Sequence, residues 1–131
     1  MRIALIVAAL SLIVLGCSRE PAPRLAGVDL YLNYCAACHG ANGEGEGPVA
    51  SVMKIQVPNL RVLSQRNDGS FPEEAITEYI DGRTSVVAHG DRQMPIWGDV
   101  FRWENDGDPS AEQRVAQRIA AIVEFLKEFQ Y

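Results

Sequence analysis

The residues with the clearest capacity for chemistry are two cysteines and a histidine within five positions, Cys35-Ala36-Ala37-Cys38-His39. Side chains three positions apart lie about one turn apart on a helix, so both thiols can face the same side. Two such thiols can form thioethers with the two vinyl groups of one porphyrin, and the imidazole that follows can bind its iron. The pentapeptide therefore predicts covalent attachment of one haem through Cys35 and Cys38, with His39 as an axial iron ligand.

Two other kinds of site also use a Cys-x-x-Cys pair. A thioredoxin-like dithiol would follow a hydrophobic strand, whereas here a helical pattern precedes the cysteines and a glycine-rich loop, residues 42–48, follows them. A zinc site would need further ligands at short spacing, and Cys17 and His89 are the only other cysteine and histidine in the chain. Both alternatives fit the sequence less well than haem attachment.

The first sixteen residues resemble an export signal. Met1-Arg2 gives a positive start, and the apolar stretch from Ile3 to Leu15 is shorter than the about 20 residues of a membrane span. Its end, Val14-Leu15-Gly16-Cys17, resembles the lipobox of bacterial lipoproteins, in which the cysteine receives a diacylglycerol. We expect residues 1–16 to be a cleaved lipoprotein signal peptide and Cys17 to be lipidated. The alternative is an ordinary secretory signal followed by a stray cysteine.

Length and charge limit what remains. Removal of residues 1–16 leaves 115 residues, enough for one small domain, and changes the formal charge from −5 to −6 because Arg2 is the only charged residue removed. An acidic protein is a poor partner for nucleic acid or for anionic lipid. Membrane attachment should therefore come from the lipid on Cys17, with the polar, proline-containing residues 17–26 as a short tether and residues 27–131 as the haem domain.

The elements that must position the pentapeptide are predicted to be helices, with almost no strand. Helical spacing and helix-end residues indicate helices over residues 27–35, 59–64, 71–81 and 110–129. Pro72 suits the first turn of the third helix, Gly82 its end, and Ser110 is expected to cap the last. The apolar stripe of the last helix is Val115, Ile119, Ile122, Val123 and Leu126. The loop of residues 42–48 is expected to wrap the haem edge.

Several short motifs occur in an order that resembles the small bacterial monohaem class I cytochromes c. They are Gly27-x3-Tyr31-x3-Cys35, the segment from Cys35 to Gly40, Gly47-Pro48, Val57-Pro58-Asn59-Leu60 and Met94-Pro95-x-Trp97-Gly98, and the resemblance covers about residues 27 to 129. It implies an all-α class I cytochrome c fold of about four to five helices around one covalently bound haem c. It also implies that the first and last helices cross, with Gly27 permitting close approach and Phe125 or a neighbour packing against it.

The resemblance places the second axial ligand at Met94, which occurs in a Met-Pro segment between helices. A thioether sulfur is soft and favours ferrous iron, so a His/Met pair raises the reduction potential. His89, beside Gly90 and Asp91 in a polar segment, is the alternative ligand and would give bis-histidine iron of lower potential. Met53 is interpreted as a core residue.

Three residues are candidates for supporting roles. The resemblance implies that the Pro48 carbonyl accepts a hydrogen bond from the other ring N–H of His39 and so fixes the orientation of the imidazole. Trp97 and Arg83 are candidates for contact with the haem propionates. The simpler interpretations are that Trp97 only packs and that Arg83 only interacts with a helix end while its charge stays in water.

A closed, six-coordinate haem can exchange one electron but has no position for a substrate, so we expect an electron carrier and not an enzyme. The expected protein is a monomer on the periplasmic or extracytoplasmic face of a bacterial membrane. It would carry electrons between a respiratory or photosynthetic complex and a terminal oxidase or reductase, with redox partners that carry a basic docking patch. No nucleic acid or small-molecule substrate is expected. The alternatives are a relay subunit of an oxidoreductase complex and a five-coordinate gas-binding or sensor cytochrome.

Overall fold

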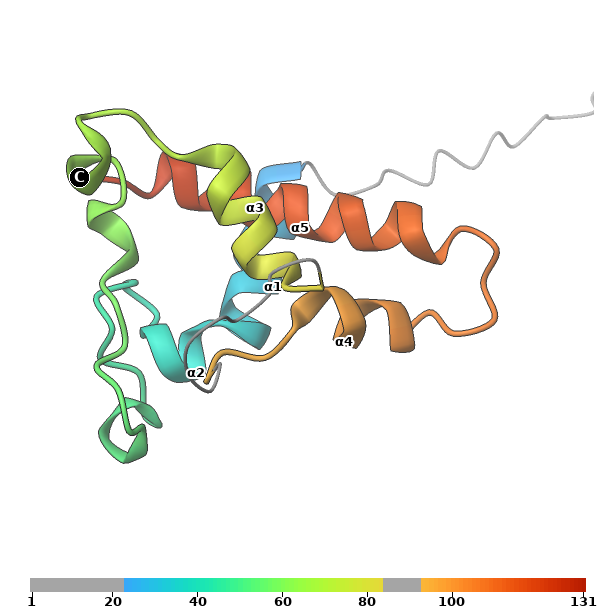
Figure 1. The fold of residues 1–131 in the computed structure, drawn as a ribbon, viewed down its shortest axis with the longest axis horizontal. Helices are drawn as coiled ribbons and strands as arrows, with labels where there is room; N and C mark the ends of the chain where they lie inside the picture. Colours follow the sequence, from blue (N-terminus) through green and yellow to red (C-terminus); the bar gives the residue numbers. More distant parts are fainter. Residues whose placement is uncertain (1–22, 84–92) are drawn as a thin grey trace, which may run out of the picture.

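The computed structural model describes residues 23–83 and 93–131, and within these ranges it contains helices and no strand (Figure 1). The α-helices are α1 (Pro23–Tyr34), α2 (Ala36–His39), α3 (Glu73–Asp81), α4 (Trp97–Trp103) and α5 (Ala111–Glu128). Three 3₁₀ turns join them, η1 (Ala50–Val52), η2 (Leu60–Val62) and η3 (Gln65–Asn67). The predicted all-α class is confirmed. Within the same ranges, no helix has both the length and the apolar character to cross a bilayer.

Helices α1 and α5 come from opposite ends of the described chain and cross at the centre of the fold (Figure 1). At the crossing, a Cβ atom on Gly27 would collide with the backbone oxygen of Ala121 and would lie 2.9 Å from the Cβ atom of Phe125. Only a residue without a side chain lets the two backbones approach this closely. The predicted crossing and the roles of Gly27 and Phe125 in it are confirmed.

Helix α1 begins four residues earlier than expected. The sequence was interpreted as an irregular tether up to residue 26, but the helix starts at Pro23. Proline is compatible with the first turn of a helix because the N–H that it lacks would have no partner there. The helix therefore begins within the last residues of the expected tether, and Cys17 lies outside the described residues.

The hydrophobic core forms where α3 and α4 pack against α5. Its buried members from the other helices are Tyr31, Ile80 and Phe101. The predicted apolar stripe of α5 is confirmed, since all five of its residues are buried: Val115, Ile119, Ile122, Val123 and Leu126. The buried face of α5 therefore forms a large part of the hydrophobic core.

Helix α4 has no counterpart among the predicted helices. Three of its seven residues are aromatic and Gly98 lies in its first turn, so its intrinsic helix propensity is low. Phe101 is fully buried and Val100 packs against the core. Tertiary burial therefore stabilises this helix, and the sequence pattern alone does not indicate it.

Helix ends also differ from expectation in two places. The helix predicted over residues 59–64 is only the 3₁₀ turn η2, in which the Asn59 side chain accepts a hydrogen bond of 2.8 Å from the Arg61 N–H. The Ser110 hydroxyl does not cap α5; its N–H and hydroxyl both donate to Asp108 Oδ1, at 2.8 Å. Gly82 ends α3 in the left-handed conformation, φ 71°, as predicted.

Candidate haem site

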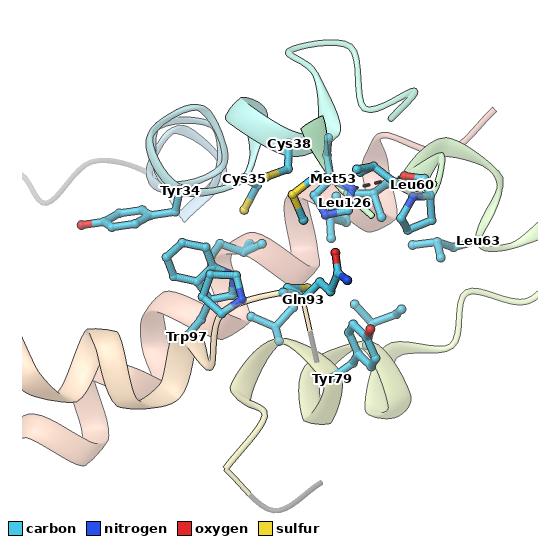
Figure 2. A pocket seen from close by; sticks show the side chains of 18 of the residues that line it. Tyr34, Cys35, Cys38, Met53, Leu60, Leu63, Tyr79, Gln93, Trp97 and Leu126 are labelled. Carbon is cyan, nitrogen blue, oxygen red and sulfur yellow. Dashed lines mark hydrogen bonds between the residues drawn. The ribbon is translucent and has the colours of Figure 1, made fainter. Parts of the chain in front are cut away.

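The two cysteines lie at the junction of α1 and α2 and face one cavity. The Cys35 N–H donates to the Tyr31 carbonyl and the His39 N–H to the Cys35 carbonyl, both at 2.9 Å, so helical hydrogen bonding continues across the junction. Both thiols are free and partly buried. Figure 2 shows the Cys35 and Cys38 sulfurs side by side at the wall of the cavity, on the same side of the helix. The spacing therefore places both sulfurs at the same cavity.

The glycine-rich loop folds back over the end of α2. Its backbone donates from Gly45 to the His39 carbonyl (2.8 Å) and from Gly47 to the Cys38 carbonyl (3.0 Å). These bonds satisfy carbonyls that a helix end leaves without partners. A Cβ atom on Gly47 would collide with the carbonyl oxygen of Ala37, so the loop can approach only with glycine there. The loop thus fixes the end of the helix that carries His39.

Tyr31 connects the same helix end to the core. Its hydroxyl donates a hydrogen bond of 2.6 Å to the Gly40 carbonyl, and its side chain is fully buried. Burial raises the pKa of the Tyr31 phenol well above its usual value, so the hydroxyl stays protonated as a donor. Tyr31, four positions before Cys35, therefore links α1 to the turn that follows His39.

The His39 imidazole is buried and has a polar partner at one of its ring nitrogens. The imidazole is 8% exposed, and its Nδ1 lies 3.2 Å from the Pro58 carbonyl oxygen. Burial lowers the pKa of His39, while the Pro58 carbonyl opposes this shift. A neutral imidazole that donates through Nδ1 keeps its lone pair on Nε2, which is the atom available to iron.

The proline that contacts His39 is Pro58, and the prediction of Pro48 is wrong. Pro48 lies in the part of the loop whose backbone bonds α2, whereas the segment with Pro58 passes the imidazole because the Leu60 N–H donates to the Gly43 carbonyl at 2.7 Å. The motif Val57-Pro58-Asn59-Leu60 was visible in the sequence. Its contact with His39 depends on this long-range pairing of two loops.

The thiols and the imidazole line an apolar cavity of about 280 Å³. Its walls come from α1, α2, residues 53–63, α3, the segment before α4, and α5. The lining residues are Tyr34, Cys35, Cys38, His39, Met53, Ile55, Val57, Pro58, Leu60, Leu63, Ile76, Tyr79, Ile80, Gln93, Met94, Pro95, Trp97, Ile122 and Leu126. An apolar hollow with a few polar groups suits a large flat aromatic ligand.

The environment of Cys35 differs from that of a reactive dithiol. Burial, with a smaller contribution from the neighbouring Cys38, raises the pKa of the Cys35 thiol to about 12. Thioredoxin-like cysteines act as thiolates, and their pKa values are lowered. At neutral pH Cys35 is therefore a neutral thiol, which argues against the dithiol alternative. A thioether at this position would place no charge in the apolar cavity.

Both candidate methionines line the cavity. Met94 lies in the segment before α4 and packs against the hydrophobic core. Met53 is only partly buried and also lines the cavity, so its interpretation as a core residue is wrong. It follows η1, which brings it next to the cysteine sulfurs (Figure 2). His89, the other candidate ligand, lies outside the described residues.

Trp97 and Arg83 occupy different surroundings. Trp97 lines the cavity and packs against Tyr34, with ring centroids 5.5 Å apart. The Arg83 guanidinium instead forms ion pairs with Asp81, at 2.6 Å, and with Glu112, at 2.8 Å. Arg83 is absent from the described lining of the cavity. Its predicted contact with a haem propionate is therefore not supported, because two carboxylates already bind the guanidinium.

The residues present fit a covalently attached haem. Two neighbouring thiols can form the thioethers, the buried imidazole has a fixed donor partner on Nδ1, and the cavity that they share is apolar on most sides. Among the described residues, the Arg83 guanidinium directs its charge to Asp81 and Glu112.

Comparison with known proteins agrees with this arrangement. The model of the family described as Cytochrome c matches residues 25–130. Neither the curated proteins nor the solved structures include a significant match. The family match spans well over half of the chain and includes every helix described above except the first two residues of α1. The protein therefore belongs to the cytochrome c family, whose members bind covalently attached haem c and act in electron transfer.

Proposed function

We propose that the protein is a one-electron carrier whose single haem c is attached through Cys35 and Cys38 and ligated by His39 and Met94. The observation that carries the proposal is that these four side chains line one apolar cavity. The haem supplies one-electron exchange at its iron. The chain contributes the attachment, the orientation of the imidazole and the exclusion of water.

Met94 is favoured over Met53 by its place in the fold. His39 follows Cys38 directly on α2, so a ligand for the opposite face should come from another wall of the cavity. Met53 lies beside the cysteine sulfurs, whereas Gln93 and Trp97, which flank Met94, stand across the cavity from them (Figure 2). The packing of Met94 against the core also gives it a fixed position. A thioether ligand there would favour ferrous iron and a high potential.

The cellular role that we propose follows from the sequence. Cleavage after residue 16 and lipidation of Cys17 would tether the monomeric protein to the extracytoplasmic face of a bacterial membrane. There it would pass electrons from a respiratory or photosynthetic complex to a terminal oxidase or reductase. Its net negative charge favours partners with a basic patch around the docking site.

Carbon monoxide binding tests the axial ligand in the holoprotein. In Met94→Ala, the iron should gain an open position, bind carbon monoxide rapidly in the ferrous state and show a lower midpoint potential, because the soft sulfur is lost. Met53→Ala is the matched control, since it removes the other cavity methionine. It should leave the spectrum and the potential close to those of the wild type.

The reverse pattern, an open site in Met53→Ala and an unchanged spectrum in Met94→Ala, would show that the ligand is misassigned. Rapid carbon monoxide binding by the wild type would favour a gas-binding cytochrome over a carrier. Stable co-purification with an oxidoreductase after mild detergent extraction would instead favour a fixed relay subunit.

A further inference from the structure

The segment that carries Pro58 has no secondary structure of its own. Residues 53–59, all within the described part of the chain, lie between the 3₁₀ turns η1 and η2 and belong to no helix. The Pro58 carbonyl oxygen nevertheless lies 3.2 Å from Nδ1 of His39. Fixing the backbone of an irregular segment costs conformational entropy, so contacts from other parts of the chain must hold it in this position.

Some of these contacts come from residues 129–131, which follow α5 and are called the tail below. Figure 1 shows the red end of α5 reaching the green segment that contains η2. The Gln130 side chain makes two hydrogen bonds there. Its amide nitrogen donates to the Leu60 carbonyl at 2.8 Å, and its amide oxygen accepts from the Ser64 N–H at 3.0 Å. One side chain of the tail therefore holds both ends of the turn that follows Pro58.

Arg61 adds a second connection between η2 and the tail. Its Nε donates to the Phe129 carbonyl at 3.2 Å, and its own carbonyl accepts from the Tyr131 N–H at 3.0 Å. The guanidinium carbon also lies 4.1 Å from the centroid of the Tyr131 ring and 5.0 Å from that of Phe129, within the range of a cation–π contact. Backbone and side-chain contacts thus fix η2 against the tail.

The tail also contacts the glycine-rich loop. The Gly43 carbonyl accepts the hydrogen bond from Leu60 that pairs this loop with the segment of Pro58. A Cβ atom on Gly43 would lie 2.6 Å from Cε1 of Phe129, so the loop approaches the tail closely. The Tyr131 hydroxyl donates to the Glu44 carboxylate at 2.7 Å. The tail therefore contacts both of the loops whose pairing sets the partner of the imidazole.

We infer that the tail positions the Pro58 carbonyl on His39 and so influences the reduction potential of the haem. A hydrogen bond from Nδ1 makes the ring a more basic ligand through Nε2, which favours ferric over ferrous iron. A looser tail weakens this bond, so the midpoint potential should rise. The inference rests on the proposed ligation by His39 and is independent of the assignment of Met94.

The test replaces Gln130 with methionine in the holoprotein, which removes both side-chain hydrogen bonds without changing the formal charge. The midpoint potential should rise in a redox titration at constant pH. The rise should stay below about 59 mV, which corresponds to a tenfold change for a one-electron couple, because the Pro58 bond is weakened and not removed. Exchange of the Leu60 amide hydrogen should become about fivefold faster, since the two loops separate more readily.

Three other variants separate positioning from stability. Tyr131→Leu removes the ring under Arg61 and the bond to Glu44, again without a change of formal charge, and should also raise the potential. Gln117→Met makes the same replacement at an exposed position of α5 and should change neither measurement. Val115→Ala opens a cavity in the core and lowers the free energy of unfolding, but should leave the potential unchanged.

Unchanged potentials and Leu60 exchange in both Gln130→Met and Tyr131→Leu would overturn the inference, as would an equal rise of the potential in Val115→Ala. Proton nuclear magnetic resonance of the ferrous wild type tests the ligation separately, because the porphyrin ring current strongly shifts the ring protons of an axial histidine. Absence of shifted His39 resonances would refute the proposed ligation. Their presence together with unchanged variants would refute only the positioning role of the tail.

Discussion

Replacing Tyr31 with phenylalanine should lower the free energy of unfolding by about 1 kcal/mol, the net worth of one buried hydrogen bond. The substitution keeps the ring and its contact with Phe125, whose centroid lies 5.1 Å away, and removes only the hydroxyl that donates to the Gly40 carbonyl. That carbonyl also accepts from the Gly43 N–H at 3.1 Å. It therefore keeps one of its two bonds, and the larger penalty of an unpaired buried group should not arise.

Chemical denaturation of the holoprotein, followed by circular dichroism, measures this difference. In a domain of this size, 1 kcal/mol corresponds to a fall of roughly 4–8 °C in Tm. Tyr34→Phe is the matched control, because its hydroxyl bonds the exposed Glu104 and should contribute less. A loss of stability in Tyr31→Phe no greater than that in Tyr34→Phe would refute the argument that Tyr31 anchors the turn after His39.

Tyr31 should also make the free energy of unfolding depend on pH, with a decrease at high pH. Burial raises the pKa of Tyr31 in the folded protein above its unfolded value of about 10. Above that pH the unfolded chain loses the phenolic proton while the folded chain retains it, so stability falls as pH rises, by up to about 1.4 kcal/mol per pH unit. Tyr31→Phe lacks this contribution. The stability difference between wild type and variant should therefore shrink above about pH 10, and a constant difference would contradict the buried, protonated phenol.

Three further predictions address other parts of the chain. Gly27→Ala should lower the free energy of unfolding by more than Gly107→Ala, because the new methyl group collides with the Ala121 carbonyl oxygen in the first case. In the second case it meets nothing within 4 Å and carries only the cost of an alanine at φ +81°; denaturation curves compare the two variants. Arg83→Ala should leave the midpoint potential unchanged in a redox titration, since the guanidinium is bound by carboxylates outside the cavity. Cys17→Ser should move the protein from the membrane fraction to the soluble fraction on cell fractionation, and continued retention would count against a lipid anchor.

Features that depend on nearby residues were predictable. The spacing of Cys35, Cys38 and His39 is a property of one helical turn, and it placed both sulfurs on one side. The apolar period of α5 identified its buried face, and Gly82 marked the end of α3. Each of these follows from backbone geometry within a few residues, which does not require knowledge of the rest of the fold.

Features that depend on which segments meet were not predictable. The Pro58 carbonyl reaches His39 because two loops pair through Leu60 and Gly43, and no local signal distinguishes Pro58 from Pro48 as the partner. The surroundings of Met53 and the short helix α4 also depend on burial against distant elements.

The sequence by itself indicated covalently attached haem and predicted Cys35, Cys38 and His39 as its attachment and axial residues, because covalent and axial bonds need specific atoms at fixed local spacing. The tertiary structure decided what surrounds that haem. It places the Pro58 carbonyl on the imidazole, takes Arg83 out of the cavity and leaves Gln93 and Tyr79 across from the cysteines. Such neighbours are selected by the packing of α1, α3 and α5 around one core, which joins residues that are far apart in the chain.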